Sequence, residues 1–195
     1  MTHWAAPWTG QATLLAADDV DTDQIIPARY LKATTREGLG AHLFADWRNQ
    51  ADGTPKPDFP LNDPGAAGRP ILVAGRNFGC GSSREHAAWA LVDFGIRAIV
   101  APSFGDIFRS NALKNGLLPI AVDSDSWTAL VRTLEQVPEI GLTVDLPARQ
   151  LRIGTWSTSF PIDPFARFCL IEGVDELGYL LQQAGAIQAF EEQHG

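Results

Sequence analysis

Residues 71–86 read ILVAGRNFGCGSSREH, and the order of structural signals in this stretch decides the fold. The first four residues are all apolar, which is typical of a short strand buried on both faces. Glycines dominate the middle of the stretch, where they favour a turn. The residues that follow, Arg84–Phe94, carry Ala87, Leu91 and Phe94 at the spacing of one helix face. The stretch therefore predicts a strand, a glycine-rich turn and a helix.

The same alternation continues toward the C-terminus. Apolar runs and helical spacing predict, in order, strand 98–101, helix 104–115 ended by Gly116, strand 117–122 and helix 127–134. Alternating strands and helices of this length form βαβ units with a parallel sheet.

The last third of the chain has a different pattern. Residues 142–146, 150–153 and 155–160 are predicted to be short strands of an antiparallel section. Asp163 and Pro164 open a further helix as its N-cap and first residue, and more helix is expected from there to the end. The chain is thus expected to be an α/β protein with a mixed sheet and flanking helices.

A proline- and glycine-rich segment, residues 52–70, precedes the first of these strands. Proline removes backbone donors that regular structure needs, so we expect a long irregular loop. Loops of this length are commonly functional or mobile. At 195 residues the chain is long enough for one large domain, and we interpret residues 1–195 as a single domain that contains this loop.

The charge balance argues against several classes of function. The chain has 15 basic and 23 acidic residues, a formal net charge of −8, and no cluster of positive charge for nucleic acid or an anionic membrane. No apolar run approaches the roughly 20 residues that cross a bilayer, and Met1–Trp4 does not resemble the start of a secretory signal. Cys80 and Cys169 are the only cysteines. We therefore expect a cytoplasmic protein with reduced thiols and no metal or iron–sulfur site in this chain.

The glycine-rich turn does not match the familiar phosphate or nucleophile motifs. The dinucleotide pattern GxGxxG needs a glycine where Arg84 stands, and a Walker loop needs a Gly-Lys-Ser/Thr ending that is absent. The GxSxG elbow needs glycine two residues to each side of one serine, and neither Ser82 nor Ser83 has both. The turn is therefore neither a standard nucleotide site nor a standard hydrolase site.

Two interpretations of this turn stay open on residue types alone. Ser82 and Glu85 have the spacing of a capping box, which is a purely structural role. Alternatively, Ser82, Ser83 and Arg84 form an anion site with the backbone N–H groups at the start of the helix, where the guanidinium can bind a carboxylate through two hydrogen bonds. His86 is as compatible with packing as with function.

A second polar stretch, residues 18–31, reads DDVDTDQIIPARYL and holds four carboxylates within six residues. An EF-hand loop that began at Asp18 would need glycine where Asp23 stands and glutamate where Arg29 stands, so the stretch is not a calcium loop of that type. Asp and Thr are common in turns and helix caps, and a capped turn is the structural interpretation.

Together the two stretches resemble the swivelling β/β/α domain of the aconitase superfamily. The resemblance depends on DTDQIIP at 21–27 and GCGSSREHA at 79–87, and the stretch 98–120 supports it. Residues 40–48 and 162–170 narrow it to the small subunits of bacterial 3-isopropylmalate dehydratases, and it covers residues 10–193.

This resemblance implies a heteromeric hydro-lyase of leucine biosynthesis whose separate large subunit carries a [4Fe–4S] cluster. The implied reaction removes water from 2-isopropylmalate to give isopropylmaleate and adds it back as 3-isopropylmalate. By resemblance, Ser82 is the general base and Arg84 binds a substrate carboxylate. Further substrate contacts are implied for Ser83, Thr22, Asp23, Arg29, Tyr30 and Leu31.

Two alternatives remain at this point. A related small subunit would act on homoaconitate, citraconate or another substituted malate, and Lys32 would suit an additional carboxylate if it pointed inward. A protein of another class, a non-catalytic dicarboxylate-binding module, would use Ser82 and Arg84 only to bind an anion. Such a module would gain no activity from any large subunit.

Overall fold

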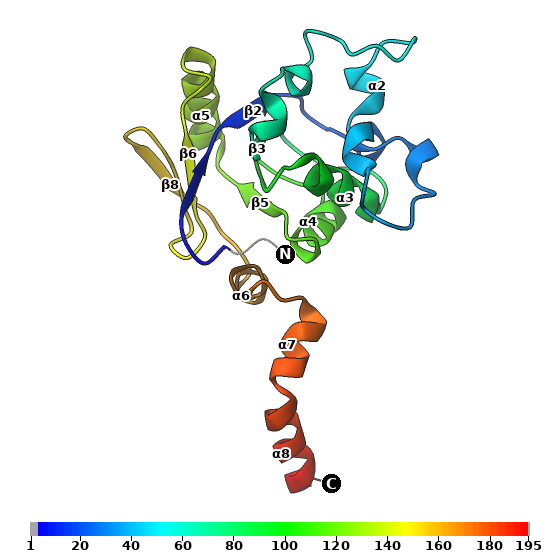
Figure 1. Cartoon of the computed structure of the whole chain (residues 1–195). Helices are drawn as coiled ribbons and strands as arrows, with labels where there is room; N and C mark the ends of the chain where they lie inside the picture. Colours follow the sequence, from blue (N-terminus) through cyan, green and yellow to red (C-terminus); the bar gives the residue numbers. More distant parts are fainter. Residues whose placement is uncertain (1–3, 195) are drawn as a thin grey trace.

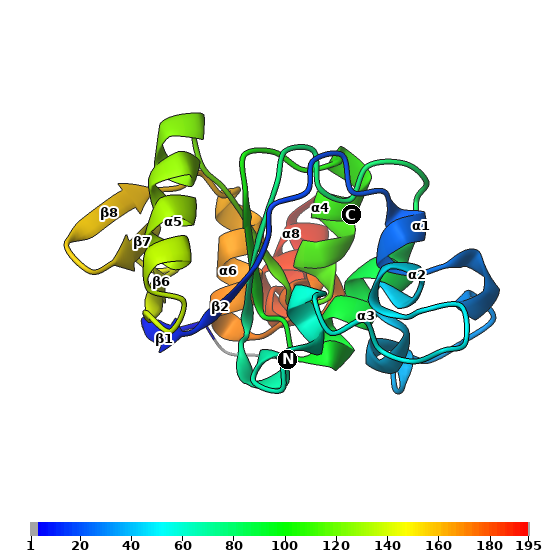
Figure 2. The same ribbon diagram turned by 90° about the horizontal axis from the view of Figure 1, so that it is seen from above.

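The computed structural model describes residues 4–194. Residues 1–3, on which the expectation of no secretory signal partly rests, lie outside this range. The strands form two separate four-stranded sheets, one parallel and one antiparallel (Figures 1 and 2). In the described part of the chain, every helix is too short or too polar to cross a membrane.

The parallel sheet has the strand order β2-β3-β4-β5. Its strands are Ala12–Leu15, Ile71–Ala74, Ala98–Ala101 and Leu118–Ala121. Along β3 the side chains alternate between two cores: Leu72 belongs to one apolar cluster, and Ile71 and Val73 belong to the other. Because both faces are buried, β3, β4 and β5 are apolar without interruption, which is why these three strands are predicted from the sequence.

The antiparallel sheet has the strand order β1-β6-β7-β8. Its strands are Trp8–Gly10, Leu142–Asp145, Gln150–Ile153 and Trp156–Ser159. The expected α/β class is confirmed, but the expected mixed sheet is wrong, because the parallel and antiparallel strands form two separate sheets. Strands β1 (WTG) and β2 (ATLL) are not predicted, because each contains a threonine and neither is a continuous apolar run.

The helices cover the parallel sheet from both sides. Figure 2 shows α3 (Glu85–Phe94) and α4 (Asp106–Lys114) on one side, and α5 (Ser124–Gln136) with the antiparallel sheet on the other. Helix α5 begins three residues earlier than expected, because the Asp123 carboxylate caps it by accepting the N–H of Ser126 at 2.8 Å. Helix α4 begins two residues later than expected, after Gly105.

The C-terminal helices are α6 (Pro164–Glu172), α7 (Glu176–Gln182) and α8 (Ala184–His194). Asp163 caps α6 and Pro164 is its first residue, as expected from the sequence. Helices α7 and α8 extend away from the rest of the molecule (Figure 1). Two short helices, α1 (Thr22–Ile25) and α2 (Ala45–Arg48), lie in the N-terminal segment.

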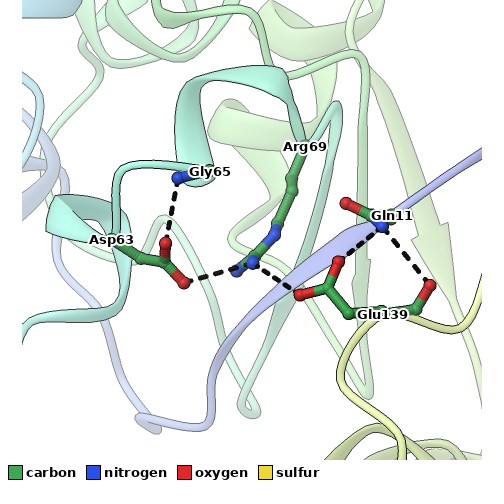
Figure 3. Close-up of polar contacts among 5 residues, drawn as sticks. All are labelled: Gln11, Asp63, Gly65, Arg69 and Glu139. Atoms are coloured by element: carbon green, nitrogen blue, oxygen red, sulfur yellow. Dashed lines mark hydrogen bonds and ion pairs between the residues drawn. The ribbon is translucent and has the colours of Figure 1, made fainter.

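The proline-rich segment 52–70 holds no strand of either sheet and contains two short 3₁₀ helices, Pro60–Asn62 and Ala66–Gly68. Arg69 joins it to the turn between α5 and β6. The guanidinium Nη2 of Arg69 lies 3.1 Å from a carboxylate oxygen of Asp63 and 3.1 Å from one of Glu139 (Figure 3). Gln11 donates to the other oxygen of Glu139 at 2.6 Å. The Arg69 side chain, only 13% exposed, therefore holds two separate segments together.

Replacing Arg69 with methionine is expected to lower the free energy of unfolding by about 1–2 kcal/mol. The substitution keeps much of the packing but leaves Asp63 and Glu139 without their shared partner, and both carboxylates are half-exposed, which limits the loss. Urea denaturation measures this change. Arg132→Met on the exposed face of α5 is the matched control, with an expected change within about 0.5 kcal/mol. Equal effects of the two substitutions would contradict a role of Arg69 as a tie.

Candidate functional site at the carboxyl ends of strands β2 and β3

The two polar stretches meet where β2 and β3 end. These strands are parallel neighbours, with Leu15 paired to Ala74 at their carboxyl ends. Beyond them the chains stay together, because Gly79 donates its N–H to Val20 at 2.7 Å and Thr22 donates its N–H to Cys80 at 2.9 Å. Ligand sites of open α/β sheets lie at such carboxyl ends. The structure thus brings Thr22 and Asp23 to the same edge as Ser82 and Arg84.

Residues 79–84, which we call the serine turn, depend on two glycines. Gly79 and Gly81 have positive φ values of 74° and 90°, a region that other residues rarely adopt. A Cβ at Gly79 would collide with the Phe108 ring, and a Cβ at Gly81 would collide with the Asp21 carboxylate. Only glycine therefore lets the turn approach α4 and residue 21 this closely.

The structure corrects the capping-box interpretation of Ser82 and Glu85. Helix α3 begins at Glu85 with Arg84 as its N-cap residue, and no side chain caps it. The Glu85 carboxylate instead accepts a hydrogen bond from the side chain of Asn115 at 2.9 Å. Glu85 is engaged by Asn115, the residue that follows α4, so the local S-x-x-E pattern does not form a capping box. The true capping box of this region is in α1, between Asp21 and Gln24, which confirms the expected capped turn.

Because neither serine hydroxyl caps α3, both hydroxyls are available to a ligand. Ser82 and Ser83 are exposed, and within residues 4–194 the hydrogen bonds of the turn leave both hydroxyls unused. The first N–H groups of α3 receive no side-chain cap, and an uncapped helix N-terminus favours negative charge. The serine turn therefore combines hydroxyls, backbone donors and the positive end of a helix dipole.

Thr22 and Asp23 support this turn from α1. Thr22 is buried, and its hydroxyl donates to the backbone carbonyl of Ser82 at 3.0 Å. Asp23 forms an ion pair with the guanidinium of Arg84, whose side chain is only 15% exposed. Thr22 therefore contacts the turn's backbone, and Asp23 contacts the cation that would bind a carboxylate.

The remaining candidates, Arg29, Tyr30 and Leu31, lie in the segment after α1. Arg29 pairs with Asp46 and lowers the pKa of that carboxyl, chiefly through the hydrogen bond between them. The guanidinium of Arg29 also covers the Tyr30 ring, 4.7 Å from its centroid. Tyr30 and Leu31 are partly buried against the core, and Lys32 is exposed. None of these side chains contacts the serine turn directly in the hydrogen bonds and ion pairs of the described chain.

Sequence reasoning does not identify the residues that shape the edge around the serine turn. Asp19 and Asn77 both have positive φ, 54° and 57°, and their side chains share a hydrogen bond of 2.8 Å. Asp18 accepts the N–H of Arg76 at 2.7 Å. The only signal in the sequence is the acidic run itself, since these contacts join residues almost 60 positions apart.

The two cysteines are poor candidates for chemistry or for a cluster. Burial, and after it the charges of Asp21 and Asp19, raise the pKa of the Cys80 thiol, which keeps it protonated and weakly nucleophilic. Cys169 lies in α6, far along the chain. No group of three His, Cys, Asp or Glu side chains within the described residues is arranged to hold a metal ion. The described residues therefore do not fit a [4Fe–4S] cluster.

The fold defines a class of protein, an α/β swivelling domain, and comparisons with known proteins agree. The aconitase C-terminal domain family matches residues 6–125. The 3-isopropylmalate dehydratase small subunit of Chloroflexus aurantiacus is 57% identical over 95% of this chain and 93% of its own length. That of Anaeromyxobacter dehalogenans is 56% identical over 93% of both.

A solved structure supports the same assignment. The 3-isopropylmalate dehydratase chain from Methanocaldococcus jannaschii superimposes with a TM-score of 0.65 at 31% identity, over 95% of this chain and 99% of that one. The chain belongs to the 3-isopropylmalate dehydratase small-subunit family, which are hydro-lyase subunits with the aconitase C-terminal domain. The resemblance, the fold class and the enzyme class expected from the sequence are confirmed.

Proposed function

We propose that this chain supplies half of an active site that interconverts 2-isopropylmalate and 3-isopropylmalate in the cytoplasm, and that a large subunit supplies the other half with its [4Fe–4S] cluster. The proposal depends chiefly on Ser82 and Ser83. Both are exposed beside Arg84 at the start of α3, and neither caps this helix. Water leaves 2-isopropylmalate as a proton and a hydroxide to give isopropylmaleate, and adds back at the neighbouring carbon.

In this proposal Ser82 takes the proton from the carbon next to a substrate carboxylate. A serine hydroxyl is far too weak an acid to ionise near neutral pH by itself. A helix N-terminus stabilises a negative charge by about 0.3–1 kcal/mol, and by roughly 2 kcal/mol in a partly buried site. Arg84, the backbone N–H groups and exclusion of water must supply the rest, and the exposed turn gains that exclusion only when a partner covers it.

Arg84 binds a substrate carboxylate, and Asp23 fixes the orientation of its guanidinium. A planar guanidinium can donate two parallel hydrogen bonds to a carboxylate. Thr22 holds the backbone of the turn through Ser82, and Ser83 presents a second hydroxyl. Tyr30 and Leu31 supply an apolar wall for the isopropyl group, and Arg29 lies over the Tyr30 ring at the same wall of the substrate site.

The substrate preference of the assembled enzyme tests this assignment against its nearest alternative. Lys32 is exposed, so the proposed wall for the substrate's side group is apolar and offers no partner for the extra carboxylate of homoaconitate. We therefore expect kcat/KM for 2-isopropylmalate to exceed that for homoaconitate by at least about tenfold. Steady-state rates of the purified two-subunit complex give both values. Lys32→Ala is the control and should leave the ratio unchanged. A preference for homoaconitate that Lys32→Ala removes would instead place this lysine in the site and contradict the proposal.

A further inference from the structure

His86 makes a contact that the proposed chemistry does not use. It lies in the first turn of α3, four residues after Ser82, and its Nε2 atom is 2.9 Å from the backbone carbonyl oxygen of Ala33. A carbonyl oxygen only accepts hydrogen bonds, so Nε2 carries the proton and donates it. The ring also lies against Trp89, with centroids 4.7 Å apart. His86 thus connects the helix of the serine turn to the segment that follows Tyr30 and Leu31.

The part of α3 that carries His86 is fixed to Asn115, the residue that follows α4. Asn115 donates to the Glu85 carboxylate at 2.9 Å and accepts from the indole N–H of Trp89 at 2.9 Å. The residues on both sides of His86 in the helix are therefore held by one side chain of a neighbouring element. The hydrogen bond from His86 therefore attaches Ala33 to a part of α3 that is itself held in place.

The segment at the other end is held unevenly. Its beginning is secured by Arg29, which pairs with Asp46, and by Tyr30, whose ring stacks on His42 with centroids 3.9 Å apart. Its continuation, Thr34–Glu37, is exposed and separated from α3 by an open cleft of about 370 Å³. Leu31 and Ala33 also pack against the apolar core, and just after the segment Gly40 donates its N–H to Asp93 of α3 at 2.7 Å. Within the described residues, the bond from His86 is the side-chain hydrogen bond that joins α3 to residues 31–37 themselves.

We propose that His86 is a positioning residue that fixes residues 31–33 beside the serine turn and so sets the width of the pocket for the substrate's alkyl group. This inference rests on the proposed function, because it assigns the wall of the same site. Without this hydrogen bond, apolar packing alone would hold residues 31–33 against α3, and Leu31 would move more freely relative to the turn. The enzyme would then bind the branched substrate less tightly and discriminate less between side groups.

Two substitutions separate the hydrogen bond from the ring. His86→Phe keeps a flat ring against Trp89 and removes the donor, whereas His86→Gln keeps an N–H donor of similar reach. In the two-subunit complex, His86→Phe is expected to raise KM for 2-isopropylmalate about two- to tenfold, the value of one hydrogen bond, with kcat nearly unchanged. It should also lower the preference for 2-isopropylmalate over 2-methylmalate. His86→Gln should restore most of both. Thr128→Val, which removes one comparable bond on the exposed part of α5, should change neither.

A second measurement does not depend on activity. Amide hydrogen exchange of the full chain should be faster at residues 31–37 in His86→Phe than in the wild type, His86→Gln or Thr128→Val. Unchanged exchange, or faster exchange with an unchanged preference between the two substrates, would overturn the inference. If the wild-type complex is inactive on both substrates, the proposed function fails and the specificity role fails with it, while the exchange result still reports the tether. If His86→Phe does not fold, His86→Asn, which is too short to reach Ala33, takes its place.

Discussion

Replacing Ser82 with alanine is expected to lower kcat of the assembled two-subunit enzyme by at least about 100-fold, the usual cost of losing a general base. The stability of the fold should change little. Ser82 is exposed and does not cap α3, so we expect the free energy of unfolding to stay within about 0.5 kcal/mol of the wild type. A serine that served as a helix cap would instead cost about 0.5–2 kcal/mol and leave catalysis intact.

The two readouts for Ser82 therefore separate catalysis from structure. Steady-state rates with 2-isopropylmalate measure the first, and urea denaturation of the isolated chain measures the second. Ser110→Ala, an exposed serine in α4 away from the turn, is the matched control and should change neither. Activity of Ser82→Ala within a few-fold of wild type would rule out a base at this position.

The second large effect is expected for Arg84→Lys, which should lower kcat/KM by roughly 10- to 100-fold. Lysine keeps the positive charge but cannot donate two parallel hydrogen bonds to a carboxylate, and charge-assisted bonds are each worth about 1.5–3 kcal/mol. The side chain is largely covered and paired with Asp23, so a lysine would also lose the orientation that this pair provides.

Arg76→Lys is the control for Arg84. Arg76 lies at the same edge of the sheet and is ion-paired with Asp19, but its side chain is 58% exposed, so its replacement should change kcat/KM by no more than about twofold. Steady-state kinetics of both variants in the complex provide the comparison. Equal losses for the two arginines would mean that positive charge at this edge matters, and that Arg84 has no specific contact with substrate.

The sequence predicts the elements whose signals are local. Strands β3 and β4 are apolar on both faces, and α6 begins with Asp163 and Pro164, so short windows are enough to find them. Strands β1 and β2 each contain a threonine and lack a continuous apolar run, so the same windows do not find them. The division into two sheets depends on pairings such as Trp8 with Val144, which join distant parts of the chain.

The same distinction holds in the site. The serine turn and its glycines can be predicted, because residues 75–86 carry the whole pattern. The prediction of a capping box between Ser82 and Glu85 is wrong, because Glu85 instead accepts a hydrogen bond from Asn115, thirty residues away. Three further contacts each join residues more than fifty positions apart, so no local pattern predicts them. They are Thr22 with the Ser82 carbonyl, Asp23 with Arg84, and His86 with Ala33.

The central claim is that this chain holds half of an active site, and one measurement tests it most directly. The rate of isopropylmaleate formation from 2-isopropylmalate is measured with this chain alone, with a cluster-loaded large subunit alone, and with the two mixed. We predict turnover only in the mixture, because the serine turn is exposed and the described residues provide no cluster site. Turnover by this chain alone, or an inactive mixture, would contradict the account.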